Sequence, residues 1–278
     1  MKNILITGAK SYIGESFKQY LEQWPGQYKV EVMETKGLKP QAEMFLGVDA
    51  IFCVTGIAHI KETVNNRRLY YDVNRDLVVD IAKAAKDAGV KQFVLLSSMS
   101  VYGMEIGHIT KATSPHPLNA YGDSKYQADE MIKELEEEDF IFTCLRPPMV
   151  YGKNCKGNYQ RLRDFALKSP FFLNYQNQRS MIYIGNLCEF VKEAIEQQKR
   201  GLYFPQNDEY TNTCRMVELI AQEHGKKIKL IRVPDWAIKF AKLNIVKKVF
   251  GNLTYEPIDL VSKYGFEESI KLTEKKNT

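Results

Sequence analysis

The sequence lacks the cysteine and histidine patterns that mark disulfide-bonded and metal-binding proteins. It contains no Cys-x-x-Cys pair, and its odd number of cysteines is scattered along the chain. The five cysteines are Cys53, Cys144, Cys155, Cys188 and Cys214. This pattern argues against a disulfide framework and a zinc site, and the four histidines are isolated, so we predict no metal. We expect the cysteines to be small buried side chains in a protein of the reducing cytoplasm.

Long hydrophobic runs and charge of one sign are also scarce. No apolar run approaches the roughly 18 residues of a membrane span, and an apolar strand begins at Asn3, so we predict neither a secretory nor a membrane segment. The net charge of +5 is spread along the chain and does not indicate a nucleic-acid-binding protein. The stretch from Trp236 to Phe250 mixes apolar residues with four lysines. We expect a helix packed on the core there, with a membrane-surface helix as the alternative.

What the chain does contain is the composition of an ordinary globular protein, with 278 residues, of which 44% are hydrophobic and 26% charged. This length allows one large α/β domain or two modest ones. In the first half, continuous apolar strands alternate with amphipathic helices. The strands are expected at 4–6, 30–33, 50–54, 93–96 and 141–145, and the helices at about 13–21, 78–89 and 123–138. This alternation predicts a parallel sheet covered on both faces.

After Gly152 the pattern loosens. We expect helices at about 158–168, 186–198 and 213–224, strands at 181–184 and 202–204, and a loop around 169–178. Neither an internal repeat nor a low-complexity linker interrupts the chain. The C-terminal part is therefore expected to be small, discontinuous and packed against the sheet.

The turn after the first strand, residues 7–14, reads Thr-Gly-Ala-Lys-Ser-Tyr-Ile-Gly. Gly8 permits a tight turn and Gly14 permits close packing of the helix on the sheet, which leaves backbone N–H groups free for a pyrophosphate. Ser11 replaces the middle glycine of the usual fingerprint. The predicted cofactor-binding residues of this turn are Gly8, Lys10, Ser11, Tyr12, Ile13 and Gly14.

An acidic residue, Glu34, lies 20 residues beyond Gly14, at the end of the second expected strand. A carboxylate there accepts hydrogen bonds from the ribose hydroxyls of NAD and repels the 2′-phosphate of NADP. Lys10 and Lys36 are nearby cations that would suit a 2′-phosphate. We therefore predict NAD as the cofactor and keep NADP as the alternative.

Tyr121 and Lys125 are four residues apart at the start of a helix, and therefore share one face. A phenol has a pKa of about 10, and a nearby ammonium favours its phenolate, which suits a general base. Upstream, the strand at 93–96 is followed by the hydroxyl-rich run Ser97 to Gly103, at the carboxyl edge where parallel sheets bind ligands. The two segments together predict a catalytic site.

These motifs, in this order, resemble those of the extended short-chain dehydrogenase/reductases in the NAD-dependent epimerase/dehydratase family, which act on nucleotide sugars. The resemblance covers nearly the whole chain. It rests on residues 7–14, 56–59, Asn74, 97–103, Tyr121 with Lys125, 146–152, 156–158 and 179–183. It implies a Rossmann-type, doubly wound parallel sheet.

The resemblance implies a role for each matching residue. Tyr121 would remove a sugar hydroxyl proton while the same carbon gives a hydride to NAD, and Ser98 would bond the reacting oxygen. Lys125 would lower the pKa of Tyr121 and bind the nicotinamide ribose. The other implied cofactor contacts are Thr55, Gly56, Ile57, Asn74, Ser97 and Pro148. The implied substrate contacts are Tyr102, Asn158 and Arg179, the last a guanidinium suited to a diphosphate.

The resemblance also implies a division of the chain. The NAD-binding Rossmann domain would comprise 1–152 and about 182–210, and the substrate-binding part about 153–181 and 211–278. The implied partner is a nucleotide-sugar substrate, with neither nucleic acid nor membrane. A homodimer would form through helices at 77–88 and 123–138.

Three reactions of this family compete. A 4,6-dehydratase would carry an Asp-Glu pair directly after the active hydroxyl residue, where this chain has Met99 and Ser100, so dehydration is disfavoured. Because Glu34 favours NAD, we predict a 4-epimerase acting on a UDP-hexose or UDP-HexNAc in surface-polysaccharide biosynthesis. The alternatives are an NAD(P)H-dependent reductase of nucleotide 4-ketosugars and a catalytically silent NAD-binding sensor. The presence of the full Ser-Tyr-Lys set argues against the sensor.

The chain is short between Glu34 and Asp49. A fuller relative would fit another helix, a strand and an aspartate for the adenine into this segment. We therefore expect the sheet to lack one strand on the adenine side. We also expect weaker retention of NAD than in a typical epimerase.

Overall fold

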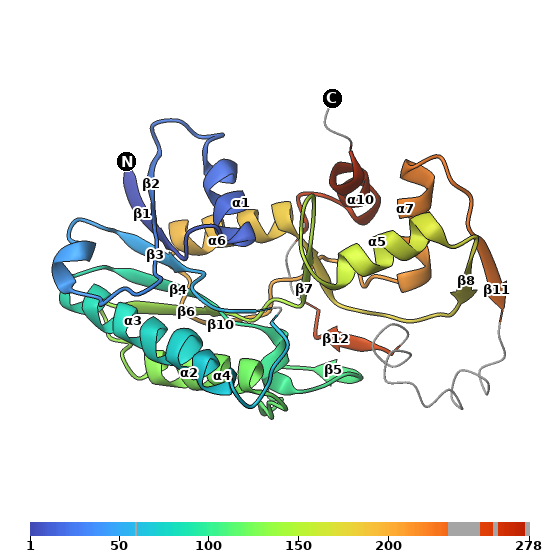
Figure 1. Cartoon of the computed structure of the whole chain (residues 1–278). Coiled ribbons are helices and arrows are strands. Elements are labelled where there is room, and N and C mark those ends of the chain that lie inside the picture. Colours follow the sequence, from blue (N-terminus) through green and yellow to red (C-terminus); the bar gives the residue numbers. More distant parts are fainter. Residues whose placement is uncertain (59, 233–250, 258–260, 276–278) are drawn as a thin grey trace. The chain divides into compact units, whose positions relative to one another are not determined.

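The computed structural model describes residues 1–58, 60–232, 251–257 and 261–275. The chain divides into two compact units (Figure 1). Unit 1 consists of Met1–Gly103, Ser114–Pro147 and Leu187–Pro205, and unit 2 consists of Met104–Thr113, Pro148–Asn186 and Gln206–Thr278. Unit 1 contains all three predicted catalytic residues.

The centre of unit 1 is a six-stranded sheet with the strand order β10-β6-β4-β3-β1-β2. Its strands are β1 (Lys2–Thr7), β2 (Tyr28–Met33), β3 (Ala50–Cys53), β4 (Gln92–Leu96), β6 (Ile141–Leu145) and β10 (Gly201–Tyr203). Every neighbouring pair is parallel. All four residues of β3 are buried, as expected where a sheet is covered on both faces. The parallel sheet predicted from the apolar strands is confirmed.

Helices cover both faces of this sheet (Figure 1). One face carries α1 (Tyr12–Leu21) and α6 (Ile184–Glu196), and the other carries α2 (Arg67–Tyr71), α3 (Val78–Asp87) and α4 (Ala120–Lys133). The Tyr20 hydroxyl of α1 donates a hydrogen bond to the Glu189 carboxylate of α6, so these two helices are in direct contact. The arrangement is the doubly wound α/β fold that the sequence predicted.

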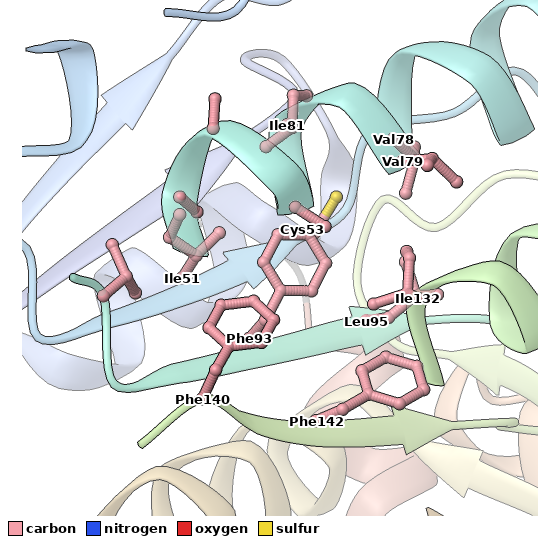
Figure 2. Close-up of a cluster of buried hydrophobic side chains, with 14 of the residues drawn as sticks. Ile51, Cys53, Val78, Val79, Ile81, Phe93, Leu95, Ile132, Phe140 and Phe142 are labelled. Atoms are coloured by element: carbon pink, nitrogen blue, oxygen red, sulfur yellow. The ribbon is translucent and has the colours of Figure 1, made fainter. Parts of the chain in front are cut away.

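An apolar cluster fills the space between the sheet and the helices α3 and α4 (Figure 2). Ile51 of β3 and Phe93 of β4 point into it, opposite Ile81 of α3. Phe52, the next residue of β3, lies on the other face and packs edge-on against Phe17, with ring centroids 5.1 Å apart. Each such side chain contributes about 1.5–3 kcal/mol by its burial.

All five cysteines are buried free thiols, which confirms their prediction as small core side chains.

The sheet ends at β2 on the side where the chain is short. Between β2 and β3 the structure has only a 3₁₀ turn, η1 (Ala42–Phe45). The expectation that this side lacks one strand is therefore confirmed. Charged side chains on β2, such as the exposed pair Lys29 and Glu31, protect the open edge from pairing with other strands.

Unit 2 is built from short paired strands and helices. The pairs are β5 (Gly107–Ile109) with β12 (Leu253–Tyr255), β7 (Met149–Tyr151) with β9 (Met181–Tyr183), and β8 (Phe171–Asn174) with β11 (Lys229–Arg232). The helices among its described residues are α5 (Asn158–Lys168), α7 (Thr213–Glu223) and α10 (Phe266–Glu274). Strand β8 corrects the loop expected at 169–178. It forms because β11, far along the chain, supplies its hydrogen bonds, and no local pattern reveals that pairing.

The units differ in places from the division expected from the sequence. Met104–Thr113 belongs to unit 2, although it lies inside the segment 1–152, because β5 pairs with β12. The start of the segment 182–210 also belongs to unit 2, because β9 pairs with β7. That one unit binds the cofactor and the other the substrate stays a prediction.

The basic stretch from Trp236 to Phe250, expected to be a helix, lies outside the described residues. Of the helices within the described ranges, none combines the length and the apolar character that crossing a bilayer requires.

Candidate active site

The glycine-rich turn after β1 fits a dinucleotide because it runs close to the end of β3. Gly8 has a φ of +93°, and a Cβ there would lie 3.0–3.1 Å from the backbone of Val54 and Thr55. A Cβ on Gly14 would lie 3.0 Å from the side chains of Ile6 and Val54. Only glycine fits at these positions without displacing its neighbours. The turn therefore brings backbone N–H groups to the carboxyl edge of the sheet, as a pyrophosphate site requires.

The residues between the two glycines shape the start of α1. Lys10 is exposed and has a φ of 65°. Ser11 is the N-cap of α1, and its hydroxyl accepts a hydrogen bond from the N–H of Gly14 at 3.4 Å. Tyr12 is the first residue of the helix, followed by Ile13. The turn thus presents the positive end of the α1 dipole, which favours a bound anion.

Glu34 follows β2 directly, at the open edge of the sheet. It is exposed, and its carboxylate accepts hydrogen bonds from the N–H groups of Thr35 at 2.9 Å and Lys36 at 3.1 Å. These backbone bonds lower the pKa of Glu34, and the charges of Lys10 and Lys36 lower it further. The residue is therefore ionised at neutral pH, as the preference for NAD requires. That preference itself stays a prediction.

Asn74 ties the turn after β3 to α4. It lies in a π-helical turn, η2 (Asp72–Leu77), and is fully buried. Its Oδ1 accepts from the N–H of Ile57 at 2.7 Å, and its Nδ2 donates to the carbonyl of Ile57 at 3.1 Å and to the hydroxyl of Ser124 at 3.3 Å. A Cβ on Gly56 would lie 3.0 Å from Asn74 Oδ1 and 3.1 Å from Lys125 Nζ. Asn74 thus positions this turn, and its predicted cofactor contact stays a prediction.

Two acceptors from outside the helix fix the start of α4. The side chain of Asn119, its N-cap, accepts from the N–H of Gly122 at 2.8 Å. Glu62 accepts from the N–H of Ala120, also at 2.8 Å. Such caps satisfy the free donors of a first turn and determine where a helix begins. They thereby determine where Tyr121 and Lys125 point.

Lys125 is buried, with only 4% of its surface exposed. Its Nζ donates to the carbonyl of Leu96 at 3.0 Å and to the carbonyl of Thr55 at 3.3 Å. Burial lowers the pKa of this amine. The ammonium therefore connects the ends of β3 and β4 beneath the turn at Gly56, which places it beside the predicted cofactor contacts Thr55 and Gly56.

The side chain of Ser98 lies near the phenol of Tyr121. Burial raises the pKa of Tyr121 above its ordinary value of 10.0, and the nearby hydroxyl of Ser98 opposes this rise. The spacing of Tyr121 and Lys125 predicted that Lys125 lowers this pKa. In the structure the net direction is upward because the phenol is buried, and the Lys125 ammonium donates to the carbonyls of Thr55 and Leu96. The hydroxyl of Ser98 also caps η3 (Met99–Tyr102) by accepting from the N–H of Ser100 at 3.1 Å.

Two residues predicted to touch ligands are hydrogen-bonded within the protein. Ser97 is buried and donates to Asp129 Oδ2 at 2.8 Å. Tyr102 is 2% exposed, and its hydroxyl accepts from Arg146 Nη1 at 2.9 Å. The geometry therefore gives no support to the cofactor contact of Ser97 or the substrate contact of Tyr102. Sequence reasoning did not single out Asp129, although its position four residues after Lys125 places both on one helical face.

The remaining predicted site residues belong to unit 2. Asn158 is the exposed first residue of α5, which is capped by Gly157. Arg179 donates from Nη1 to the carbonyl of Gly251 at 2.7 Å, and burial lowers its pKa. Pro148, where unit 2 resumes after unit 1, is buried. Their roles in binding substrate and cofactor stay predictions.

A glycine-rich turn at the edge of a parallel sheet, together with a Tyr-x-x-x-Lys pair at the start of a helix, is typical of enzymes that bind a nicotinamide dinucleotide. The family described as "NAD dependent epimerase/dehydratase family" matches residues 4–203. The chain belongs to this family, and it is an NAD(P)-dependent enzyme of the extended short-chain dehydrogenase/reductase type.

Curated relatives are similar over much of the chain. An N-acetyl-alpha-D-glucosaminyl-diphospho-ditrans,octacis-undecaprenol 4-epimerase of Escherichia coli O157:H7 is 26% identical over 252 residues, which is 84% of this chain and 75% of that protein. A UDP-glucose 4-epimerase of Vibrio cholerae is 31% identical over 199 residues. That match covers 66% of this chain and 61% of the relative.

Solved structures show the same fold. A UDP-glucuronic acid 4-epimerase from Bacillus cereus in complex with NAD has a TM-score of 0.76 at 15% identity, with 98% of this chain and 97% of that chain covered. A dTDP-4-dehydrorhamnose reductase from Clostridium acetobutylicum has the same TM-score at 16% identity, with 98% of each chain covered.

The open edge at β2 leads to a prediction about the cofactor. In the described part of the sheet no strand lies beyond β2, on the side where we predict the adenine to bind, so we expect extensive dialysis to remove NAD from the purified protein. The nucleotide released by heat denaturation, measured by chromatography before and after dialysis, checks this. Retention of one NAD per chain through dialysis would show that the missing strand does not weaken binding.

Proposed function

We propose that this protein is an NAD-dependent nucleotide-sugar 4-epimerase that uses Ser98, Tyr121 and Lys125. The observation that carries the proposal is the clustering of these three residues where β4 ends against α4. Tyr121 lies near Ser98, and Lys125 donates a hydrogen bond to the carbonyl of Leu96, the strand residue just before Ser97. The curated relatives named as 4-epimerases support the same reaction.

Each residue has a chemical task in this proposal. Tyr121 removes the proton of the sugar C4 hydroxyl and returns it at the end of the cycle. Ser98, which lies near the phenol, donates a hydrogen bond to the reacting oxygen and holds it there. Lys125 places its amine beneath the turn at Gly56, where it can bind the nicotinamide ribose of the cofactor. When bound, NAD supplies the acceptor and later the donor of the C4 hydride.

The residues around Ser98 separate this reaction from dehydration. Met99 and Ser100 follow it, and the N–H of Met99 donates to the carbonyl of Pro147 at 3.0 Å. Neither side chain can act as an acid or a base at neutral pH. A reductase needs the same three residues and consumes NAD(P)H once for each product. The cofactor requirement therefore distinguishes an epimerase from a reductase.

A second candidate substrate is a sugar bound through diphosphate to a polyprenol. The E. coli relative, which matches 84% of this chain, acts on such a molecule according to its name. In unit 2 the β8 and β11 pair exposes Phe171 (49%) and Ile231 (39%), with Lys229 and Arg232 also exposed beside them. Apolar and basic side chains together suit a lipid diphosphate better than a free nucleotide.

The experiment incubates purified protein with UDP-glucose, UDP-GlcNAc or polyprenyl-diphospho-GlcNAc, with no addition, with catalytic NAD, or with stoichiometric NAD(P)H. If the protein is a 4-epimerase, we expect it to invert the C4 hydroxyl of one of these sugars with no more than catalytic amounts of NAD. Turnover only of 4-ketosugars with stoichiometric NAD(P)H identifies a reductase. If the protein binds NAD yet converts no sugar, and Tyr121→Phe changes nothing measurable, the silent-sensor alternative is favoured.

We further propose that the enzyme works in the cytoplasm as a homodimer. Its buried free thiols suit a reducing compartment. The helices expected at the dimer interface correspond to α3 and α4, and α4 exposes Met131 (40%). Light scattering of the purified protein measures the mass in solution. Replacing Met131 by glutamate is expected to shift a dimer toward the monomer.

A further inference from the structure

One face of α4 contacts the end of β4 at three successive helical turns. Tyr121 lies near Ser98, Lys125 donates to the carbonyl of Leu96, and Asp129 accepts from the hydroxyl of Ser97. A spacing of four residues places all three side chains on one stripe of the helix. The predicted catalytic pair is thus the first two members of a row of three.

Asp129 is the most deeply buried member of this row, with 2% of its surface exposed. Its Oδ2 accepts two hydrogen bonds, from Ser97 Oγ at 2.8 Å and from Arg146 Nε at 2.9 Å. Its Oδ1 is buried and has no hydrogen-bond partner among the described residues. Arg146 follows β6 and is itself 5% exposed. The ion pair therefore lies inside the unit, one helical turn from Lys125.

The burial of Asp129 with Arg146 is not well explained by a contribution to stability. A buried ion pair contributes little net stability, because the cost of removing both charges from water offsets their attraction. Leaving one carboxylate oxygen without a partner adds to that cost. What the pair does provide is a fixed negative charge close to Lys125 and Tyr121, and an acceptor that holds Ser97.

We propose that Asp129 is a positioning residue of the active site, which fixes Ser97, and with it Ser98, and places a negative charge behind Lys125 and Tyr121. The inference rests on the proposed roles of Ser98, Tyr121 and Lys125. Ser97 and Ser98 are adjacent at the strand end, so an anchor on one limits where the hydroxyl of the other points. Ser97 is also held by its backbone, since its N–H donates to the carbonyl of Leu145 at 2.7 Å.

The charge of Asp129 acts on both members of the catalytic pair. Burial lowers the pKa of Lys125, and Asp129 is among the groups that raise it. Burial raises the pKa of Tyr121, and Asp129 raises it further. Removing the negative charge is therefore expected to lower both pKa values. The other titratable and charged groups facing this row are Arg146 and Cys144 at β6, Tyr102 of η3, Cys53 of β3 and Tyr70 of α2.

Asp129→Asn tests the charge, because asparagine keeps the size and an oxygen acceptor for Ser97. We expect kcat to fall by about 10- to 100-fold with KM changed little, since a small misplacement near the reacting atoms has this effect. We also expect both apparent pKa values of the pH profile of kcat/KM to move to lower pH by about one unit. A merely structural role would lower the rate without moving the profile.

Two further variants separate the roles of the carboxylate. Asp129→Glu keeps the charge and moves it by one methylene, so we expect a reduced kcat with a profile close to that of the wild type. Ser97→Ala removes the hydroxyl that Asp129 holds and leaves the charge, so we again expect a reduced kcat with a pH profile close to that of the wild type. The matched control is Glu274→Gln. Glu274 of unit 2 has a side chain only 1% exposed and is paired with Arg163 at 2.6 Å, and its loss is expected to leave the profile unmoved.

A readout that needs no substrate keeps this inference separate from the proposed reaction. Tyrosines labelled with ¹³C at Cζ are titrated by NMR, and the signal absent from Tyr121→Phe belongs to Tyr121. Asp129→Asn is expected to lower its titration midpoint, and Glu274→Gln is not. An unchanged midpoint in a folded Asp129→Asn, verified by circular dichroism, would overturn the charge role. If that variant does not fold, a wild-type kcat in both Asp129→Glu and Ser97→Ala would overturn the positioning role.

Discussion

Replacing Tyr121 by phenylalanine is expected to lower kcat by about 10²- to 10⁴-fold, the usual contribution of a positioned general base. The substitution removes only the hydroxyl, so the packing of the ring against Tyr70, with centroids 6.4 Å apart, is kept. Initial rates of C4 inversion, with NAD binding measured separately by fluorescence, check this result.

The matched control is Tyr126→Phe, which removes a hydroxyl one residue after Lys125 on the same helix. The ring of Tyr126 lies 5.8 Å from the Arg146 guanidinium carbon, and phenylalanine keeps that contact. We expect near wild-type turnover. If Tyr121→Phe retained full activity while Tyr126→Phe lost it, the base would have been assigned to the wrong tyrosine.

The direction of the pH dependence follows from the environment of Tyr121. Burial raises its pKa, and a base acts in its deprotonated form. The reactive fraction therefore increases as the pH rises, and we expect kcat/KM of the wild type to increase from pH 6 to pH 9. In Tyr121→Phe, we expect the residual kcat/KM to be the same from pH 6 to pH 9.

The main sheet could be predicted because its strands are apolar along their whole length. Ile51 and Phe52 of β3 face opposite sides and are both buried, so the strand appears in the sequence as a continuous apolar run. The short strands of unit 2 have no such signature. β8 exists because it pairs with β11, and β5 because it pairs with β12, and both pairings join segments far apart in the sequence.

In the candidate site too, only the features that are local in the sequence could be predicted. The spacing of Tyr121 and Lys125 is local and could be recognised, and so could the serines after β4. The partners of Asp129 come from elsewhere, since Arg146 follows β6 and Ser97 follows β4. Only the order of the strands in the sheet, with β6 beside β4, brings them to one helix. The same adjacency buries Tyr102 against Arg146, which the motif alone did not indicate.

Arg146→Met is expected to destabilise the protein by about 3–5 kcal/mol at pH 8, because it leaves the Asp129 carboxylate buried without a counter-charge. Burial already raises the pKa of Asp129, and Arg146 opposes that rise, so the pKa should rise further in the variant. An acid whose pKa is raised in the folded state stabilises the fold at low pH and loses this contribution as the pH rises through its folded pKa. The loss in free energy of unfolding relative to the wild type should therefore be smaller at pH 5 than at pH 8.

Urea unfolding of wild type and variant at both pH values measures this difference. Arg146→Met combined with Asp129→Asn removes the unpaired charge, so we expect it to recover part of the loss and to be less destabilised than Arg146→Met alone at pH 8. Arg163→Met is the comparison in unit 2. Its partner Glu274 keeps hydrogen bonds from the hydroxyl of Tyr159 at 2.8 Å and from the ring of His224 at 2.7 Å, so a smaller loss is expected. If Arg146→Met loses the same free energy of unfolding at pH 5 and at pH 8, Asp129 does not change its protonation when its partner is removed.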